Sequence, residues 1–347
     1  MTGFLVLEDG SVFHGRSVGA HDIAFGEAVF TTAMTGYQEI VTDPSYAEQL
    51  VCFTAPMVGN YGVSPTRSES TAAHARGVLM RQATGQEWSR WLAGQGIVAL
   101  EEIDTRSLVL RLRQRGAMRA AAVAGNASVE EVLSQVRVRA GMEGQALVAG
   151  VSTETAYTVG RGSVSLGVLD YGCKRSIVER AVAAGARVTV YPHSTDAQTL
   201  LAARHDGIVL SNGPGDPAAL PAEAVVVAEL IGRVPLLGIC LGHQLLALAA
   251  GFETFKLPFG HRGANHPVLD VRANRVLVTS QNHGFAVKGD RPEVAHISLY
   301  DGTVEGLALP GERARSVQFH PEAGPGPHDA RYLIESWVEE VRVAEAA

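Results

Sequence analysis

The chain has 347 residues, 46% hydrophobic and 19% charged, which predicts two domains of ordinary size, each with its own core. Its net charge of -7 argues against nucleic acid or an anionic membrane surface as the main partner. No apolar run reaches the length of a membrane span, and the first residues lack the basic segment of a signal peptide. Three scattered cysteines without a C-x-x-C pair predict neither a disulfide framework nor a zinc site, so we expect a reducing, cytoplasmic location.

Residues 1–150 are predicted to form a β-rich α+β domain. Short β-like runs separated by turn signals cover residues 4–7, 11–13, 28–32 and 49–54. Helical spacing covers residues 87–93 and 105–115, and a further helix begins at Val129 with Ser128 as its N-cap. Residues 34–46 and 56–62 are polar, glycine-containing loops with the composition of surface turns, so spacing alone indicates no site there.

A stretch rich in Gly, Ala, Ser and Thr begins near Ala140, and we predict the domain linker at 151–163. Residues 164–347 then alternate between strands (165–170, 187–191, 206–211, 234–239) and helices (174–184, 222–231, and one from 245). Further strands follow at 275–280, 294–300, 304–308 and 314–319. This order predicts a doubly wound, mostly parallel α/β sheet with ligands at the carboxyl ends of its strands. No nucleotide motif is present, and we expect no cofactor or metal in this chain.

Cys240 lies where a predicted strand meets a predicted helix, with Gly238 and Gly242 on either side. This is the nucleophile-elbow pattern with Cys in place of Ser. The N-terminus of the following helix favours the thiolate, which is the nucleophilic form. The pattern by itself also fits a small buried cysteine behind two packing glycines.

His320 and Glu322 follow the last predicted strand. Because a residue before proline favours extended geometry, we expect these two side chains to face the same side. A carboxylate beside an imidazole fixes its tautomer and stabilises the imidazolium. Since Cys240 and His320 both end strands of one sheet, we expect Cys240, His320 and Glu322 to act as nucleophile, general base and orienting group. The loop 211–217 follows the neighbouring strand and is a candidate to bind an oxyanion through its backbone N–H groups.

Three stretches, 212–216, 238–244 and 318–322, resemble the signatures of class I glutamine amidotransferase domains. The resemblance implies that Cys240 attacks the side-chain amide of glutamine to form a γ-glutamyl thioester. It also implies that His320 moves protons, that Glu322 orients His320, and that N–H groups near Gly215 and Leu241 hold the oxyanion.

The first half, in stretches 34–46, 59–62 and 104–106, resembles the amino-terminal domain of the small subunits of carbamoyl-phosphate synthetases. The stretches 169–174, 265–268, 280–285 and 325–327 resemble the same family. This resemblance implies a glutamine pocket between the domains, with contacts from Ser45, Gly213, Gly215, Leu241, Gln244, Asn282, Gly284 and Phe285.

Membership would also imply a large partner subunit that carries the ATP, magnesium and bicarbonate chemistry and receives ammonia through a sequestered path. Three alternatives stay open from the sequence: a glutaminase component of another ammonia-using synthase, a catalytically silent regulatory or scaffold subunit, and a freestanding cysteine hydrolase. The amino-terminal domain argues against the first and third, and the intact Cys240, His320 and Glu322 set argues against the second.

Overall fold

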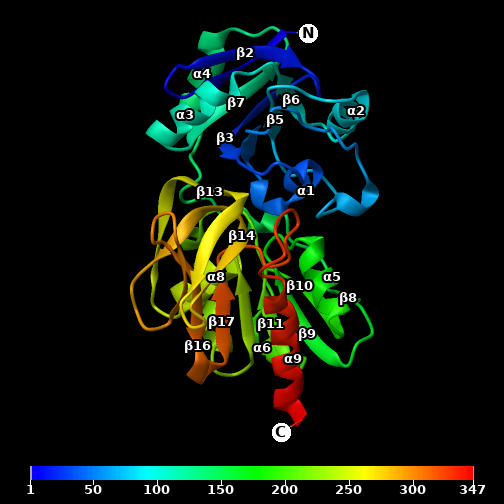
Figure 1. Ribbon diagram of the computed structural model, residues 1–347, viewed down its shortest axis with the longest axis vertical. Coiled ribbons are helices and arrows are strands. Elements are labelled where there is room, and N and C mark those ends of the chain that lie inside the picture. The colour runs from blue at the N-terminus through cyan, green and yellow to red at the C-terminus, as the bar shows by residue number, and fades with distance from the viewer. Residues whose placement is uncertain (1, 347) are drawn as a thin grey trace. The chain divides into compact units, whose positions relative to one another are not determined.

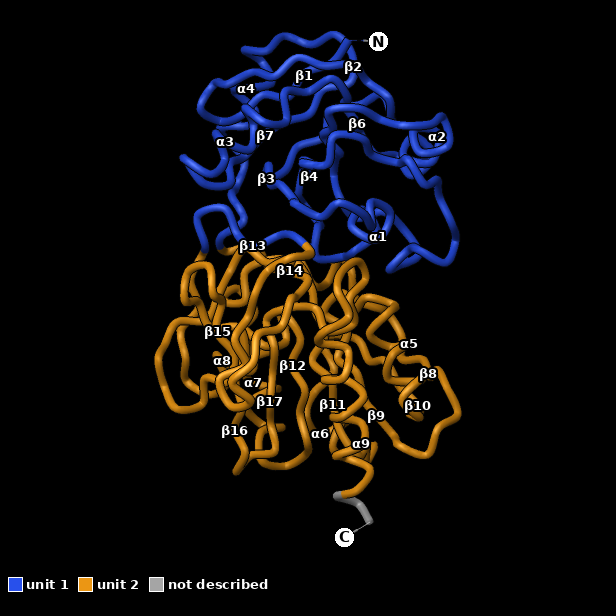
Figure 2. The backbone as a smooth tube through the Cα atoms, in the orientation of Figure 1, with its two compact units in different colours: residues 1–143, 257–263 blue, residues 144–256, 264–347 orange. Residues whose placement is uncertain are grey.

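The computed structural model describes residues 2–346, with side chains described through residue 343 (Figure 1). The chain forms two compact units, one of residues 1–143 and 257–263 and one of residues 144–256 and 264–347 (Figure 2). The division falls earlier than the expected boundary at 150. The expected linker at 151–163 belongs to the second unit, because its strand β8 (Tyr157–Val159) pairs with strand β10 (Ala186–Pro192).

The first unit contains a closed barrel of seven strands. Around the barrel the strands are β1 (Thr2–Leu7), β2 (Val12–Ser17), β6 (Val98–Glu101), β5 (Gly77–Leu79), β4 (Gln49–Phe53), β3 (Ile23–Thr31) and β7 (Met118–Ala124). Side chains alternate along β1, so that Leu5 and Leu7 pack in one core while Phe4 and Val6 pack against helix α4 (Val129–Val138). The predicted β-rich domain is thus a barrel with helices around it.

Four helices accompany the barrel: α1 (Tyr37–Thr42), α2 (Gln86–Gly94), α3 (Thr105–Arg115) and α4. Ser128 caps α4 as predicted, because its side chain accepts the backbone N–H of Glu131. Strand β7 was not predicted. Its sequence is rich in alanine, which carries no β signal, and burial in the barrel decides its conformation instead.

The second unit is built on a ten-stranded sheet in the order β14-β13-β15-β16-β17-β12-β11-β9-β10-β8. Its centre is parallel and consists of β10, β9 (Val164–Asp170), β11 (Gly207–Leu210), β12 (Leu236–Ile239) and β17 (Ala314–Val317). The other strands are β13 (Glu253–Asp270), β14 (Arg275–Lys288), β15 (Val294–Ser298) and β16 (Val304–Leu309). The carboxyl ends of the parallel strands therefore share one edge.

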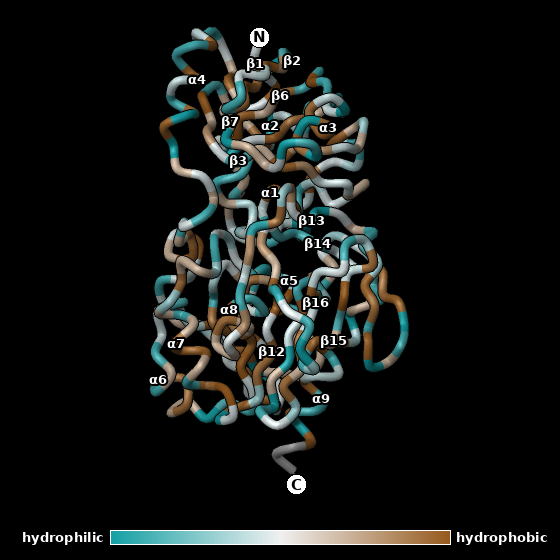
Figure 3. Tube along the Cα trace, turned by 90° about the vertical axis from the view of Figure 1, so that its left-hand side faces the viewer, coloured by the Kyte–Doolittle hydropathy of each residue, from teal (hydrophilic) through white to brown (hydrophobic). Residues whose placement is uncertain are grey.

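Helices cover both faces of this sheet, which confirms the doubly wound fold. Leu166 and Val168 of β9 pack in one cluster with α5 (Arg175–Ala183) and α9 (Tyr332–Ala346). Leu169 of the same strand packs in a second cluster with α6 (Ala197–Ala202), α7 (Pro221–Leu230) and α8 (Leu241–Ala249). Figure 3 shows hydrophobic residues around α8 and β12.

Further features of the fold were outside the prediction. The segment Leu257–Gly263 of β13 belongs to the first unit, because the N–H of Ala117 donates to the carbonyl of Pro258 at 2.7 Å and Phe259 packs on Phe30. Helices α1, α6 and α9 and strands β5, β8 and β13 were not predicted, and the buried helix α1 lies where a surface turn was expected. No helix among the described residues is long and apolar enough to cross a membrane.

Candidate active site

Cys240 forms the turn between β12 and α8, as the glycine spacing predicts. Its backbone has φ 55° and ψ -104°, a left-handed conformation that non-glycine residues rarely adopt. The N–H of Cys240 donates to the carbonyl of Val317 in the neighbouring strand β17 at 2.9 Å, so the strained residue is held by the sheet. The side chain is buried, and its sulfur lies 3.6 Å from the carbonyl oxygen of Asn282 in β14.

Gly242 packs tightly against strand β11. A Cβ at this position would lie 2.1 Å from the carbonyl oxygen of Leu210. The N–H of Gly242 donates to the carbonyl of Ser211 at 2.9 Å, which ties the elbow to the start of the candidate oxyanion loop. Because Gly242 has no side chain, the elbow can approach this loop closely enough to form that hydrogen bond.

We expect Gly242→Ala to destabilise the protein by about 3 kcal/mol, because the new methyl group meets backbone that cannot move aside. Urea unfolding of the full chain measures this change. Gly311→Ala is the matched control, since a Cβ at Gly311 meets nothing within 4 Å, and we expect it to stay within about 0.5 kcal/mol of the wild type. Equal stability of the two variants would contradict the tight elbow.

His320 lies just beyond β17, at the same sheet edge as Cys240. Its Nδ1 lies 2.7 Å from Oε1 of Glu322, and both side chains are buried. The pairing is as predicted, but its local cause is different. Residues 320–323 form a turn, closed by the N–H of Ala323 on the carbonyl of His320 at 3.2 Å, rather than an extended segment.

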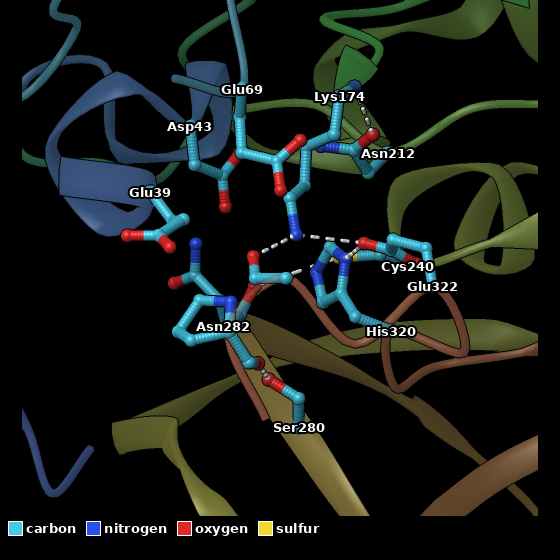
Figure 4. Close-up of polar contacts among 12 residues, drawn as sticks. Glu39, Asp43, Glu69, Lys174, Asn212, Cys240, Ser280, Asn282, His320 and Glu322 are labelled. Carbon is cyan, nitrogen blue, oxygen red and sulfur yellow. Dashed lines mark hydrogen bonds and ion pairs between the residues drawn. The ribbon is translucent and has the colours of Figure 1, made fainter. Parts of the chain in front are cut away.

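Lys174, at the N-cap of α5, is a member of this cluster that the sequence reasoning did not place there. Its ammonium Nζ donates to Oε1 of Glu322 at 2.8 Å and to the carbonyl of Gly324. Its exposure is only 2%, so this is an ion pair in the interior. Figure 4 shows Lys174, Cys240, His320 and Glu322 together, with dashed lines for the contacts of the Glu322 carboxylate.

The charges in this cluster fix the protonation of His320 and Glu322. Burial alone would lower the pKa of His320, but the charge of Glu322 and the contacts with Cys240 and Glu322 raise it to about 10. Burial alone would raise the pKa of Glu322, but the charges of Lys174 and His320 and their hydrogen bonds hold it well below its usual range. The cluster thus pairs an ionised carboxylate with an unusually basic imidazole.

Replacing Glu322 with glutamine is expected to lower the pKa of His320 from about 10 toward the ordinary value, because the charge that favours the imidazolium is removed. The positive charge of Lys174 would then no longer be neutralised by Glu322, and its repulsion of the imidazolium would lower the pKa of His320 further. A pH titration of ¹⁵N-labelled histidine by NMR measures this. Glu223→Gln, which changes the partner of His193, is the control and should leave the titration of His320 unchanged. A His320 pKa still near 10 in Glu322→Gln would contradict this account of the cluster.

The predicted glutamine contacts of the second unit lie around the elbow. Gly213 and Gly215 are in the loop after β11, Leu241 begins α8, and Gln244 lies one turn further along the helix. The other three, Asn282, Gly284 and Phe285, belong to β14. Two contacts join β14 to the elbow: the thiol of Cys240 with the carbonyl of Asn282, and Nε2 of Gln244 with the carbonyl of Phe285.

Ser45 is the predicted contact that belongs to the first unit. It lies in the 3-10 helix Pro44–Tyr46, where Asp43 accepts its backbone N–H at 2.9 Å. Its contact with glutamine stays a prediction.

Comparison with known proteins finds matches in both halves of the chain. Residues 167–339 match the model of the class I glutamine amidotransferase family, and residues 5–122 match that of the carbamoyl-phosphate synthase small chain, CPSase domain. The carbamoyl phosphate synthase small chain of Xanthomonas campestris pv. campestris is 44% identical over 99% of this chain and 98% of its own length. That of Escherichia coli K12 is 42% identical, covering 97% of each chain. This chain belongs to the carbamoyl-phosphate synthase small chain family.

The sequence contained one signal for Lys174 within this small chain. Lys174 ends the stretch 169–174 and lies four residues after β9, a buried strand of the sheet whose strand β12 leads to Cys240. A lysine at the carboxyl edge of such a sheet is close to whatever acid the edge holds. Glu322, however, lies in a turn 148 residues after Lys174, and no local pattern around Lys174 indicates that this turn comes close to it.

Proposed function

We propose that this small chain is the glutaminase subunit of a carbamoyl-phosphate synthetase, with Cys240, His320 and Glu322 as its catalytic residues. The observation that carries the proposal is the buried cluster at the carboxyl edge of the sheet. There Glu322 pairs with His320 at 2.7 Å, and the Cys240 thiol of the elbow lies in the same cluster (Figure 4). Membership in the small chain family supports the choice of synthetase.

The chemistry begins with the proton of Cys240. His320 takes this proton, because the charge of Glu322 raises the pKa of the imidazole and stabilises the imidazolium that forms. The thiolate attacks the side-chain carbonyl carbon of L-glutamine, and the carbonyl oxygen becomes an oxyanion. Backbone N–H groups near Gly215 and Leu241 are proposed to hold that oxyanion.

Collapse of the tetrahedral intermediate breaks the C–N bond. His320 gives its proton to the leaving nitrogen, which departs as ammonia and leaves a γ-glutamyl thioester on Cys240. Water then attacks the thioester while His320 accepts its proton, the C–S bond breaks to release glutamate, and His320 returns the proton to the sulfur to restore the thiol. Glu322, held ionised by Lys174, stabilises the imidazolium in both halves of the reaction.

We propose that glutamine is bound by the residues that the family resemblance implies: Ser45, Gly213, Gly215, Leu241, Gln244, Asn282, Gly284 and Phe285. The contacts of Asn282 and Phe285 with the elbow helix and its cysteine support the β14 members of this set. Ser45 rests on the family resemblance alone.

A large partner subunit is proposed to carry ATP, magnesium and the bicarbonate chemistry, and to receive the ammonia. A sequestered path is chemically reasonable because ammonia released to water is protonated and is then no longer a nucleophile. We propose a cytoplasmic location for the complex. This chain itself is expected to need no cofactor.

The test is carbamoyl phosphate formation from bicarbonate and MgATP by a synthetase large subunit, with and without this chain. We expect glutamine to serve as nitrogen donor only when the chain is present, and ammonia to serve in both cases. If the chain hydrolyses glutamine but adds nothing to the large subunit, the partner assignment is wrong and another ammonia-using synthase becomes the candidate. If the chain hydrolyses glutamine neither with the synthetase large subunit nor with another ammonia-using synthase, the catalytic assignment is wrong.

A further inference from the structure

The side chain of Gln244 is held by two acceptors. Its amide nitrogen Nε2 donates to the carbonyl of Phe285 at 2.9 Å and to Oε1 of Gln318 at 3.0 Å. Gln318 is fully buried and Gln244 is 3% exposed. The two hydrogens of the Gln244 amide are therefore both used inside the protein.

Chemistry fixes the orientation of both amides. A backbone carbonyl can only accept, so the atom of Gln244 that faces Phe285 is the nitrogen. That nitrogen can only donate, so the atom of Gln318 that faces it is the oxygen. The oxygen Oε1 of Gln244 consequently points away from both partners, and it accepts no hydrogen bond from any residue that the structure describes.

The backbone of Gln318 is held in place independently of Gln244. It follows β17, and its backbone N–H donates to the carbonyl of Glu305 in β16 at 2.8 Å. Gln244 lies in the first turn of α8, and its backbone N–H donates to the carbonyl of Cys240, the residue before the helix, at 3.2 Å. Gln318, whose backbone is bonded to β16, thus holds the side-chain amide of Gln244 one helical turn beyond the nucleophile.

We propose that Gln318 is a positioning residue that locks the amide of Gln244 with its oxygen toward the bound substrate, where that oxygen accepts a hydrogen bond from the α-ammonium group of L-glutamine. This rests on the proposed function and names a determinant of its specificity. The oxygen accepts only, so its substrate partner is an N–H donor. Because the carboxamide of the substrate is at Cys240, the α-ammonium is the remaining donor, and its charge strengthens the bond.

The experiment measures glutamine hydrolysis by the complex of this chain with the large subunit. Gln318→Met removes the acceptor and keeps the volume. We expect the KM for L-glutamine to rise about tenfold, as losing one buried hydrogen-bond partner does, while kcat changes less than about threefold. With 4-carbamoylbutanoate, which is glutamine without its α-amino group, we expect the same variant to show the wild-type KM.

Two further variants separate positioning from a general loss of structure. Gln318→Glu retains an oxygen acceptor and should restore much of the affinity for glutamine. In a Gln244→Met background, Gln318→Met should have no additional effect on KM, because Gln318 acts through Gln244. If Gln318→Met does not fold, Gln318→Asn withdraws the acceptor by one methylene, and the same rise in KM is expected.

An equal rise in KM for glutamine and for 4-carbamoylbutanoate would overturn the proposal, and so would an undiminished effect of Gln318→Met in the Gln244→Met background. A wild-type complex that does not hydrolyse glutamine would instead overturn the proposed function. The two failures are therefore distinguishable.

Discussion

Replacing Cys240 with serine is expected to abolish glutamine-dependent carbamoyl phosphate synthesis by the complex while leaving ammonia-dependent synthesis intact. The thiolate is the nucleophile, and a serine hydroxyl at the same position is far less acidic and does not form its anion at neutral pH. Ammonia enters the reaction after the glutamine step, so it does not need Cys240. Parallel assays with glutamine and with ammonia as nitrogen donor measure both activities on one preparation.

Cys173→Ser is the matched control for this variant. Cys173 is half-buried, lies outside the elbow, and its sulfur contacts the carbonyl of Lys174 at 3.4 Å, a hydrogen bond that a serine hydroxyl can also donate. We expect it to retain glutamine-dependent synthesis. Equal loss of the glutamine and ammonia activities in Cys240→Ser would contradict the proposed division of labour between the subunits.

The elbow could be predicted from the sequence because its cause is local. Gly238 and Gly242 bracket one residue between an apolar run and a helical run, and the structure shows why both must be small. A Cβ at Gly238 would lie 2.7 Å from the carbonyl of Gly242, and one at Gly242 would lie 2.1 Å from that of Leu210. The local pattern therefore predicted a turn at Cys240, but by itself it did not distinguish a nucleophile from a small buried cysteine.

The contacts of the cluster were harder to predict because they depend on distant parts of the chain. His320 and Glu322 were expected to pair through extended geometry, but a turn at 320–323 brings them together. The ion pair of Lys174 with Glu322 joins the start of α5 to that turn, which requires the order of strands in the sheet. The assignment of Leu257–Gly263 to the first unit is likewise decided by pairing across the chain rather than by any local pattern.

Replacing His320 with asparagine is expected to slow formation of the thioester by roughly a thousandfold or more, as loss of a nucleophile's base typically does. Asparagine is nearly isosteric with part of the imidazole and still offers an N–H to Glu322, so the ion pair with Lys174 can remain. It cannot take the proton of Cys240 or return it to the leaving nitrogen. Rapid-quench trapping of the glutamyl-enzyme with labelled glutamine measures the step directly.

His193→Asn is the control for this second variant, because His193 also pairs with a carboxylate, Glu223, but lies outside the cluster. It should form the thioester at the wild-type rate. Near-normal thioester formation in His320→Asn would remove His320 from the mechanism, and the high pKa of its imidazole would then serve only the buried ion pairs. A slow thioester step with unchanged ammonia-dependent synthesis would place the defect in glutamine hydrolysis, because the synthetase chemistry downstream is then intact.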